Sequence, residues 1–210
     1  MRRAGLACFT VFALALPAHA EDCSKDVLAA VEKQRTSKAF RVSMVQPTVE
    51  GPVKMTVDYL PPDRMLQTVT ADHMPGEQHT MLVGTRAFAG SGGGYEELLP
   101  HLAQSVVTEM KAAVGKPENV GTFECAGKQS FEGKDYLAYR AVDKEAKPGT
   151  PPDEVLARTI YVDEVTGLPA YNVVATVSGK APPVMKVEYS YPADVVIEAP
   201  ANAPVQKAPH

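Results

Sequence analysis

The stretch FRVSMVQPTVEGPVKMTVDYL, residues 40–60, contains two runs in which apolar and polar side chains alternate. The sequence Glu50-Gly51-Pro52, which favours a turn, separates the two runs. Alternation with a period of two is typical of antiparallel strands that have one covered and one solvated face. The apolar positions are Phe40, Val42, Met44, Val53, Met55, Val57 and Tyr59. The stretch therefore predicts two antiparallel strands with a common apolar face.

Similar signals extend over most of the chain. Turn sequences at Pro61-Pro62-Asp63 and Pro75-Gly76 bound further runs. Helical periodicity predicts helices over 22–38 and 98–114, the second ended by Gly115 and Pro117. Further strands are predicted at about 64–71, 78–84, 85–89, 121–126, 136–142, 158–163, 171–177 and 184–191. The pattern predicts an α+β fold: one curved antiparallel sheet of about ten strands with helices set against it.

The first twenty residues have the features of a secretory signal peptide. Arg2 and Arg3 precede an apolar run, and Ala18-His19-Ala20 offers small residues at the positions that signal peptidase reads. Cys8 lies within the apolar run, whereas the cysteine of a lipoprotein signal follows it. We therefore expect cleavage after Ala20 and a soluble periplasmic protein without a lipid anchor.

Composition argues against several classes of function. The chain has 21 basic and 25 acidic residues, a formal net charge of −4 and no basic cluster, which argues against binding to nucleic acid or anionic membranes. No later apolar run approaches the roughly 20 residues of a membrane-spanning helix. Residues 21–198 are expected to form one domain, and the Ala/Pro-rich residues 199–210 a disordered tail.

Two cysteines, Cys23 and Cys125, remain after removal of the leader. In an oxidising compartment an even number of cysteines favours a disulfide over two unpaired buried thiols. Closing a loop of this size stabilises a protein by about 4 kcal/mol in the chain-entropy model. The bond would tie the first predicted helix to a strand.

The glycine-rich stretch AGSGGGYEELLPHLAQSV, residues 89–106, lacks the spacing of the known catalytic and phosphate-binding loops. A phosphate loop needs a lysine directly after its glycines, and the first lysine here is Lys111. A dinucleotide fingerprint needs glycine where Tyr95 stands, and a nucleophile elbow needs glycine in place of Ala89. The stretch predicts a hairpin turn, after which Tyr95 begins another short segment.

Other chemically active side chains are sparse. His73 and His79 flank the Pro75-Gly76 turn beside two acidic residues, but they have the ligand spacing of no known metal site. We therefore predict no catalytic residue, no metal and no cofactor. A hydrolase with a dispersed site is the minor alternative, with Ser91 and His101 as its candidate residues.

Four stretches, in order, resemble the periplasmic lipoprotein-carrier superfamily of LolA-, LolB- and LppX-like half-barrels. They are AFRVSMVQ with GPVKMTVDYLPPDRMLQTV (39–46 and 51–69), HTMLVGTRAFAGSGGGYEEL (79–98), TIYVDEVTGLPAYNVVA (159–175) and VEYSYPADVVIEAP (187–200). The resemblance implies an incomplete β-barrel whose concave face is covered by two or three helices. It also implies an apolar cavity that shelters a lipid or other apolar ligand, in a carrier or sensor rather than an enzyme.

The resemblance also implies which residues line the cavity and which partners the protein has. Arg64 is expected at the mouth, paired with helix carbonyls. The expected lining residues are Phe40, Val42, Met44, Val53, Met55, Val57, Tyr59, Met65, Leu82, Leu102, Val106 and Met110. A protein partner in the periplasm or outer membrane is expected as well. The alternative is a structural or regulatory interaction domain with a filled core, which the methionine-rich composition alone favours.

Overall fold

The computed structural model describes residues 22–143, 147 and 149–207. The predicted signal peptide, its cleavage site after Ala20 and the last three residues of the predicted tail lie outside this part of the chain. Neither helix within it combines the length and the apolar content needed to cross a membrane. The elements are α1 Ser24–Arg35, β1 Phe40–Thr48, β2 Gly51–Leu60, β3 Arg64–Ala71, β4 Gln78–Val83, β5 Arg86–Ser91, β6 Gly94–Glu97, α2 Pro100–Val114, β7 Glu124–Phe131, β8 Lys134–Val142, β9 Leu156–Val162, β10 Pro169–Thr176 and β11 Met185–Ser190.

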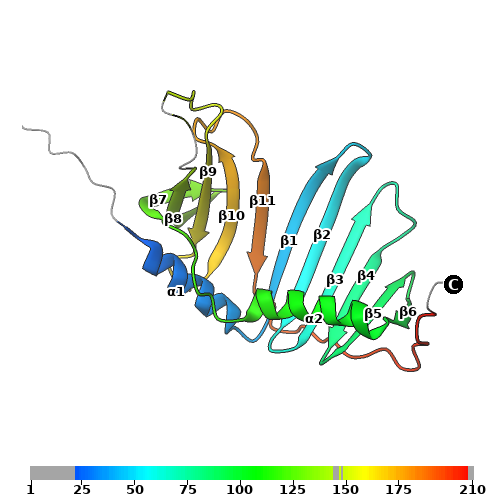
Figure 1. Ribbon diagram of the computed structural model, residues 1–210. Coiled ribbons are helices and arrows are strands. Elements are labelled where there is room, and N and C mark those ends of the chain that lie inside the picture. Colours follow the sequence, from blue (N-terminus) through cyan, green and yellow to red (C-terminus); the bar gives the residue numbers. More distant parts are fainter. Residues whose placement is uncertain (1–21, 144–146, 148, 208–210) are drawn as a thin grey trace, which may run out of the picture.

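The eleven named strands form one open antiparallel sheet, in the order β6-β5-β4-β3-β2-β1-β11-β10-β9-β8-β7 (Figure 1). The sheet consists of two meanders, β1 to β6 and β7 to β11, which join where β1 pairs with β11. Both helices cross one end of the strands, and the opposite strand ends extend beyond them. The predicted α+β class, the single antiparallel sheet and the incomplete barrel are confirmed, with eleven strands and two helices.

The β1–β2 hairpin has the register that its alternating pattern predicts. Phe40 lies opposite Tyr59, Met44 opposite Met55, and Thr48 opposite Gly51, so that two residues form the turn. The rings of Phe40 and Tyr59 stack with their centroids 4.7 Å apart. We call the side of the sheet that carries Phe40 and Met44 the helix face, because both helices pack on it. The other side is the opposite face.

The helices pack on the two meanders separately. Helix α1 lies on the β8–β9 region, where Val27, Ala30, Phe123, Ile160 and Val162 form a buried cluster. Helix α2 lies on β1 to β5, and this larger cluster contains Phe40, Val57, Tyr59, Met65, Leu82, Ala87, Ala103, Val107 and Met110. Helix α2 begins with Pro100, whose fixed φ suits a first helical position, and ends at Gly115.

A disulfide fastens the start of α1 to the edge of the sheet. Cys23 directly precedes the helix and is bonded to Cys125 of β7, with the two Cα atoms 5.3 Å apart. The Cys23 N–H also donates to the Phe123 carbonyl at 2.8 Å. The pairing predicted from the cysteine count is therefore confirmed.

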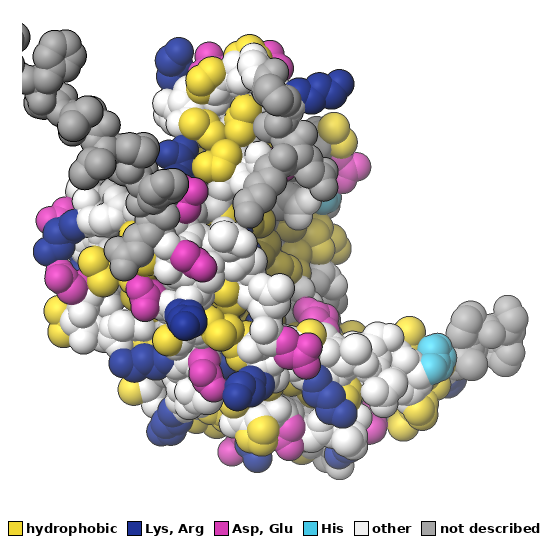
Figure 2. Space-filling model, turned by 60° about the vertical axis from the view of Figure 1, so that its left-hand side comes forward, with side chains coloured by type: hydrophobic (Ala, Val, Ile, Leu, Met, Phe, Trp, Pro, Cys, Tyr) yellow, Lys and Arg dark blue, Asp and Glu magenta, His cyan; other side chains and the backbone are white. Residues whose placement is uncertain are grey.

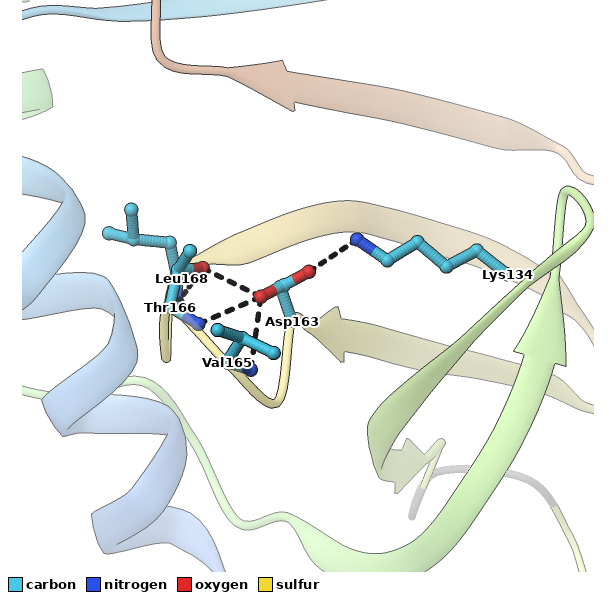
Figure 3. A network of polar contacts seen from close by, with 5 residues as sticks. All are labelled: Lys134, Asp163, Val165, Thr166 and Leu168. Carbon is cyan, nitrogen blue, oxygen red and sulfur yellow. Dashed lines mark hydrogen bonds and ion pairs between the residues drawn. The ribbon is translucent and has the colours of Figure 1, made fainter.

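The β9–β10 turn is held together by contacts of Asp163 (Figure 3). The Asp163 carboxylate accepts from the backbone N–H groups of Val165 and Thr166, and Lys134 forms an ion pair with its second oxygen at 2.5 Å. These contacts, Lys134 first, lower the pKa of Asp163 from its ordinary 3.8 to about 2. Helix α1 is fastened to this β9–β10 turn, because Lys33 of α1 donates to the Thr166 carbonyl at 2.5 Å.

The glycine-rich stretch forms a tight hairpin. Gly92 and Gly93 occupy the two turn positions with φ of 60° and 89°, where a side chain would be strained, and Ser91 pairs with Gly94. Tyr95 belongs to the short strand β6. The predicted turn is confirmed.

The last described residues run along the opposite face and the β6 edge. Ile197, 2 % exposed, packs with Met81 and Phe88, and Glu97 of β6 forms a parallel bridge with Val205. The Glu97 N–H donates to Pro204 O, and the Gln206 N–H donates to Glu97 O, both at 2.8 Å. Composition predicts disorder over 199–210. Within that segment, residues 204–206 make these backbone hydrogen bonds to Glu97.

Candidate functional site

The sheet divides where its two meanders meet. Strand β1 continues to Thr48, but its pairing with β11 covers only Arg41↔Ser190 to Met44↔Val187. Beyond Met44 the two strands separate toward the ends that the helices leave uncovered (Figure 1). Prolines contribute to this gap, because Pro47 of β1 and Pro183 just before β11 have no N–H for a ladder hydrogen bond. We call this separation the split.

A cavity of about 330 Å³ lies on the helix face beside the split, between the helices and the central strands. We call it the helix-face cavity. Its lining is Val31, Gln34, Arg35, Phe40, Val42, Met44, Tyr59, Ala113, Arg158, Ile160, Pro169, Asn172, Met185, Val187 and Tyr189. Ligand pockets span roughly 300–1,000 Å³, so the cavity is at the lower end of that range.

A second cavity, of about 600 Å³, lies on the other side of the split. This opposite-face cavity is lined by Ser43, Met44, Val45, Pro47, Lys54, Met55, Thr56, Phe131, Glu132, Pro183, Val184, Lys186 and Glu188. The β7–β8 turn closes one wall: Phe131 stacks on Tyr161 with centroids 4.4 Å apart, and Glu132 forms an ion pair with Lys186 at 2.6 Å. Met44 lines both cavities, so they meet at the split.

Large apolar side chains are exposed around the split. Val45, Val184 and Met185 are 55 %, 61 % and 37 % exposed. Figure 2 shows hydrophobic side chains in a recessed part of the surface. Single exposed apolar residues are common, but these three lie together beside the two cavities.

The helix-face cavity is apolar on its floor and cationic at one end. Its charged lining residues are Arg35 and Arg158, and no carboxylate residue is among those that line it. Arg35 donates through Nη1 to the Gly115 carbonyl at 2.6 Å, and Arg158 donates through Nε to Asn172 Oδ1 at 2.9 Å. Burial raises the pKa of the Tyr189 hydroxyl, and the positive charges of Arg158 and Arg35 partly oppose that rise. Both guanidinium groups therefore act on the same part of the cavity.

The residues predicted to line a cavity fall into distinct groups. Phe40, Val42, Met44 and Tyr59 line the helix-face cavity, and Met44 and Met55 line the opposite-face cavity. Four others fill the core beneath α2 and are at most 3 % exposed: Val57, Met65, Leu82 and Met110. Val106 packs against that core half-buried. Val53 is half-buried near the β1–β2 turn.

Two predicted positions lie elsewhere. Leu102 is 39 % exposed, because α2 turns Ala103, Val107 and Met110 toward the sheet instead. Arg64 alternates with the buried Met65 and so lies on the opposite face, where it donates to the Ile197 carbonyl at 3.0 Å rather than to a helix. Neither residue contacts the helix-face cavity.

The residues considered for chemistry are dispersed over the surface. His73 lies beside Glu50 at 3.3 Å, and His79 beside Glu77 at 3.5 Å. Ser91 is exposed at the end of β5, and His101 is exposed on α2. Within the described residues the only His, Cys, Asp and Glu cluster close enough for a metal includes both disulfide cysteines, whose sulfurs are already bonded to each other.

The polar residues of the helix-face cavity were missed by the sequence reasoning. Arg158 shares the helix face of β9 with Ile160 and Val162, so a charge stands at an apolar position of an alternating strand. That interruption was a usable signal. Arg35 gave none, because a basic residue in the last turn of a helix is common.

Solved structures share this architecture, although no protein-family model and no curated protein sequence matches the chain. The structure of LprF from Mycobacterium bovis superposes with a TM-score of 0.51 and 14 % identity, over 85 % of this chain and 97 % of that one. The chain has a LolA/LppX-like fold. An uncharacterized conserved protein from Thermus thermophilus (TM-score 0.48, 9 % identity, 87 % and 98 % covered) is also similar. So is a LolA superfamily protein from Nitrosomonas europaea (TM-score 0.29, 12 % identity, 80 % and 91 % covered). The superposition on LprF confirms the fold that the motif resemblance implies.

Proposed function

We propose that this protein binds a lipid or another apolar ligand at the split between β1 and β11, and that it acts as a carrier or sensor rather than a catalyst. The observation that carries the proposal is the pair of cavities that meet at Met44, surrounded by apolar side chains. Each methylene removed from water on binding contributes about 0.8 kcal/mol. An acyl chain at the split therefore gains affinity without any catalytic group.

The proposed site of action is the periplasm. The leader-like residues 1–20 and the Cys23–Cys125 disulfide support an oxidising, exported compartment. A carrier there also needs a protein that delivers its ligand or receives it, and exposed Val45, Val184 and Met185 offer such a partner an apolar contact.

The first test is what the protein carries. Purification from the periplasm without detergent, organic extraction and mass spectrometry should recover a lipid, and the emptied protein should take up a fluorescent fatty acid. Recovery of no lipid together with no uptake would favour the interaction domain with a filled core.

Substitutions assign the ligand to a cavity. Met44→Trp enlarges the one side chain that lines both cavities and should weaken probe binding by about tenfold or more. Val187→Phe narrows only the helix-face cavity, and Val45→Trp narrows only the opposite-face cavity. The variant that binds the probe more weakly identifies the cavity that the ligand occupies. Val49→Trp, at a fully exposed turn position next to β1, is the matched control and should bind as the wild type does.

A further inference from the structure

The charge at the end of the helix-face cavity indicates what kind of ligand the cavity accepts. The chain as a whole has a formal net charge of −4, yet the cavity is lined by two arginines and no carboxylate. The same two arginines line a neighbouring cavity of about 520 Å³, where the other charged residues are Lys116 and Glu118. Both spaces taken together therefore carry an excess of positive charge.

Neither arginine is neutralised by the protein. Arg35 and Arg158 form no ion pair with a carboxylate within the part of the chain that is described. Arg41 and Arg86 differ, since each makes a two-bond pair with a carboxylate, Asp58 or Glu97. A guanidinium has five N–H donors. Arg35 and Arg158 each donate one hydrogen bond to the protein, and the Arg158 guanidinium also lies over the Phe123 ring, 5.7 Å from its centroid. Among the described residues their remaining N–H groups form no other hydrogen bond.

Uncharged donors surround the same end of the cavity. Gln34 is 6 % exposed and lines the cavity, and its side chain also faces the Tyr191 hydroxyl, where it opposes the rise in pKa that burial causes. Tyr189, whose hydroxyl is influenced by both guanidinium groups, also lines the cavity.

Apolar side chains extend from this polar end toward the split: Phe40, Val42, Met44, Met185 and Val187. An apolar floor that ends at two guanidinium groups without a carboxylate partner matches a molecule with an acyl chain and an anionic head group. Arginine binds carboxylate and phosphate through paired N–H donors. We infer that the ligand is an anionic lipid, whose carboxylate or phosphate head lies between Arg35 and Arg158 and whose chain lies on the apolar floor. This inference rests on the proposed function.

The test compares anionic and neutral lipids of equal chain length. Palmitic acid, lysophosphatidic acid with a palmitoyl chain and the neutral alcohol hexadecanol would each displace a neutral pyrene-labelled alcohol, at about pH 8 where both acids are ionised. We expect the wild type to bind at least one anionic lipid about 10- to 100-fold more tightly than the alcohol. The ratio between the two acids tells whether the head group is a carboxylate or a phosphate, and inorganic phosphate alone should displace no probe.

Variants connect the preference to the two arginines. Arg35→Gln with Arg158→Gln should reduce the affinity for the anionic lipid to that for hexadecanol in the same variant, and circular dichroism checks that the variant has kept its fold. Arg35→Lys, which keeps a charge, should retain part of the preference. Arg64→Gln on the opposite face is the matched control and should retain all of it.

The outcomes separate the two proposals. Equal affinities of the wild type for the acids and the alcohol, or a preference that survives the double substitution, would overturn the anionic head group and leave lipid binding intact. Failure of all three lipids and the probe to bind would overturn lipid binding itself.

Discussion

The two helices cover the same face of one sheet with different results. Beneath α2 the space is filled: Met65, Leu82, Ala87 and Met110 are each at most 1 % exposed. Between α1 and the central strands a cavity of about 330 Å³ remains, with Arg35 and Arg158 in its wall. A covered apolar face is therefore not by itself a binding site.

The difference originates in the two helix sequences. Helix α2 directs Val107 and Met110 at the sheet, and these side chains fill the space between them. Helix α1 instead places Gln34 and Arg35 in the cavity wall, and polar side chains need hydrogen-bond partners where they are buried. The helix-face cavity therefore lies where the last turn of α1 carries polar side chains.

The largest expected effect concerns how each half is held. The α1 half depends on the Cys23–Cys125 bond, which closes a sequence separation of 102 residues, whereas the α2 half is held by packing. Replacing both cysteines by serine should lower the free energy of unfolding by about 4 kcal/mol. Hydrogen exchange should increase in α1 and β7 and stay near wild-type values in α2.

Reduced wild-type protein is the control and should behave like the double variant. Equal increases of exchange in both helices would show that the two halves open together, which would contradict the contrast between them.

A second prediction compares two methionines on the helix face. Met65 is fully buried beneath α2, so Met65→Ala should cost about 3 kcal/mol through lost burial and the space left behind. Met44 borders the cavities, where solvent already reaches, so Met44→Ala should cost less than about 1 kcal/mol. Urea unfolding followed by circular dichroism measures both. Similar costs would mean that the split is as tightly packed as the core.

The smallest effect is a pH dependence in the α1 half. The pKa of Asp163 is lowered to about 2, so its ionised form stabilises the fold above its ordinary 3.8, and this contribution is lost as the pH falls from about 4 to about 2. Asp163→Asn should melt a few degrees below the wild type at neutral pH, and the gap should close over that acidic interval. Glu164→Gln is the neighbouring control, since Glu164 pairs with Lys128 outside this turn. A difference in melting temperature that persists at acid pH would mean that Asp163 stabilises the fold through its packing and hydrogen bonds rather than through its charge.

Most of the fold was predictable because its signals are local. Alternation of apolar and polar residues was enough to predict β1 and β2. The β5–β6 turn was predictable from Gly92 and Gly93, because the turn needs positive φ values that glycine adopts freely. The strand β7 was predicted to end near residue 126, but it runs to Phe131. The Glu132-Gly133 turn that joins it to β8 has positive φ at both residues, and of the two only the glycine indicates a turn in the sequence.

The candidate site was only partly predictable because it depends on contacts between distant segments. Period-two alternation placed Phe40, Val42 and Met44 on the helix face, but the same pattern includes Met65 and Leu82, which α2 covers completely. Which helix lies over which strand decides the difference, and that depends on pairing between β1 and β11, some 145 residues apart in the chain. Arg35 and Arg158 come together only through this arrangement.

Residues 204–206 lie along the edge strand β6 of the open sheet. A free edge strand presents unpaired amide and carbonyl groups to which another molecule's strand can add, and such additions lead to polymers. Here Val205 lies alongside Glu97, and the chain's own last residues occupy the hydrogen-bonding groups that an intruding strand would use. Residues 204–206 therefore cover part of the β6 edge against the addition of a strand from another molecule.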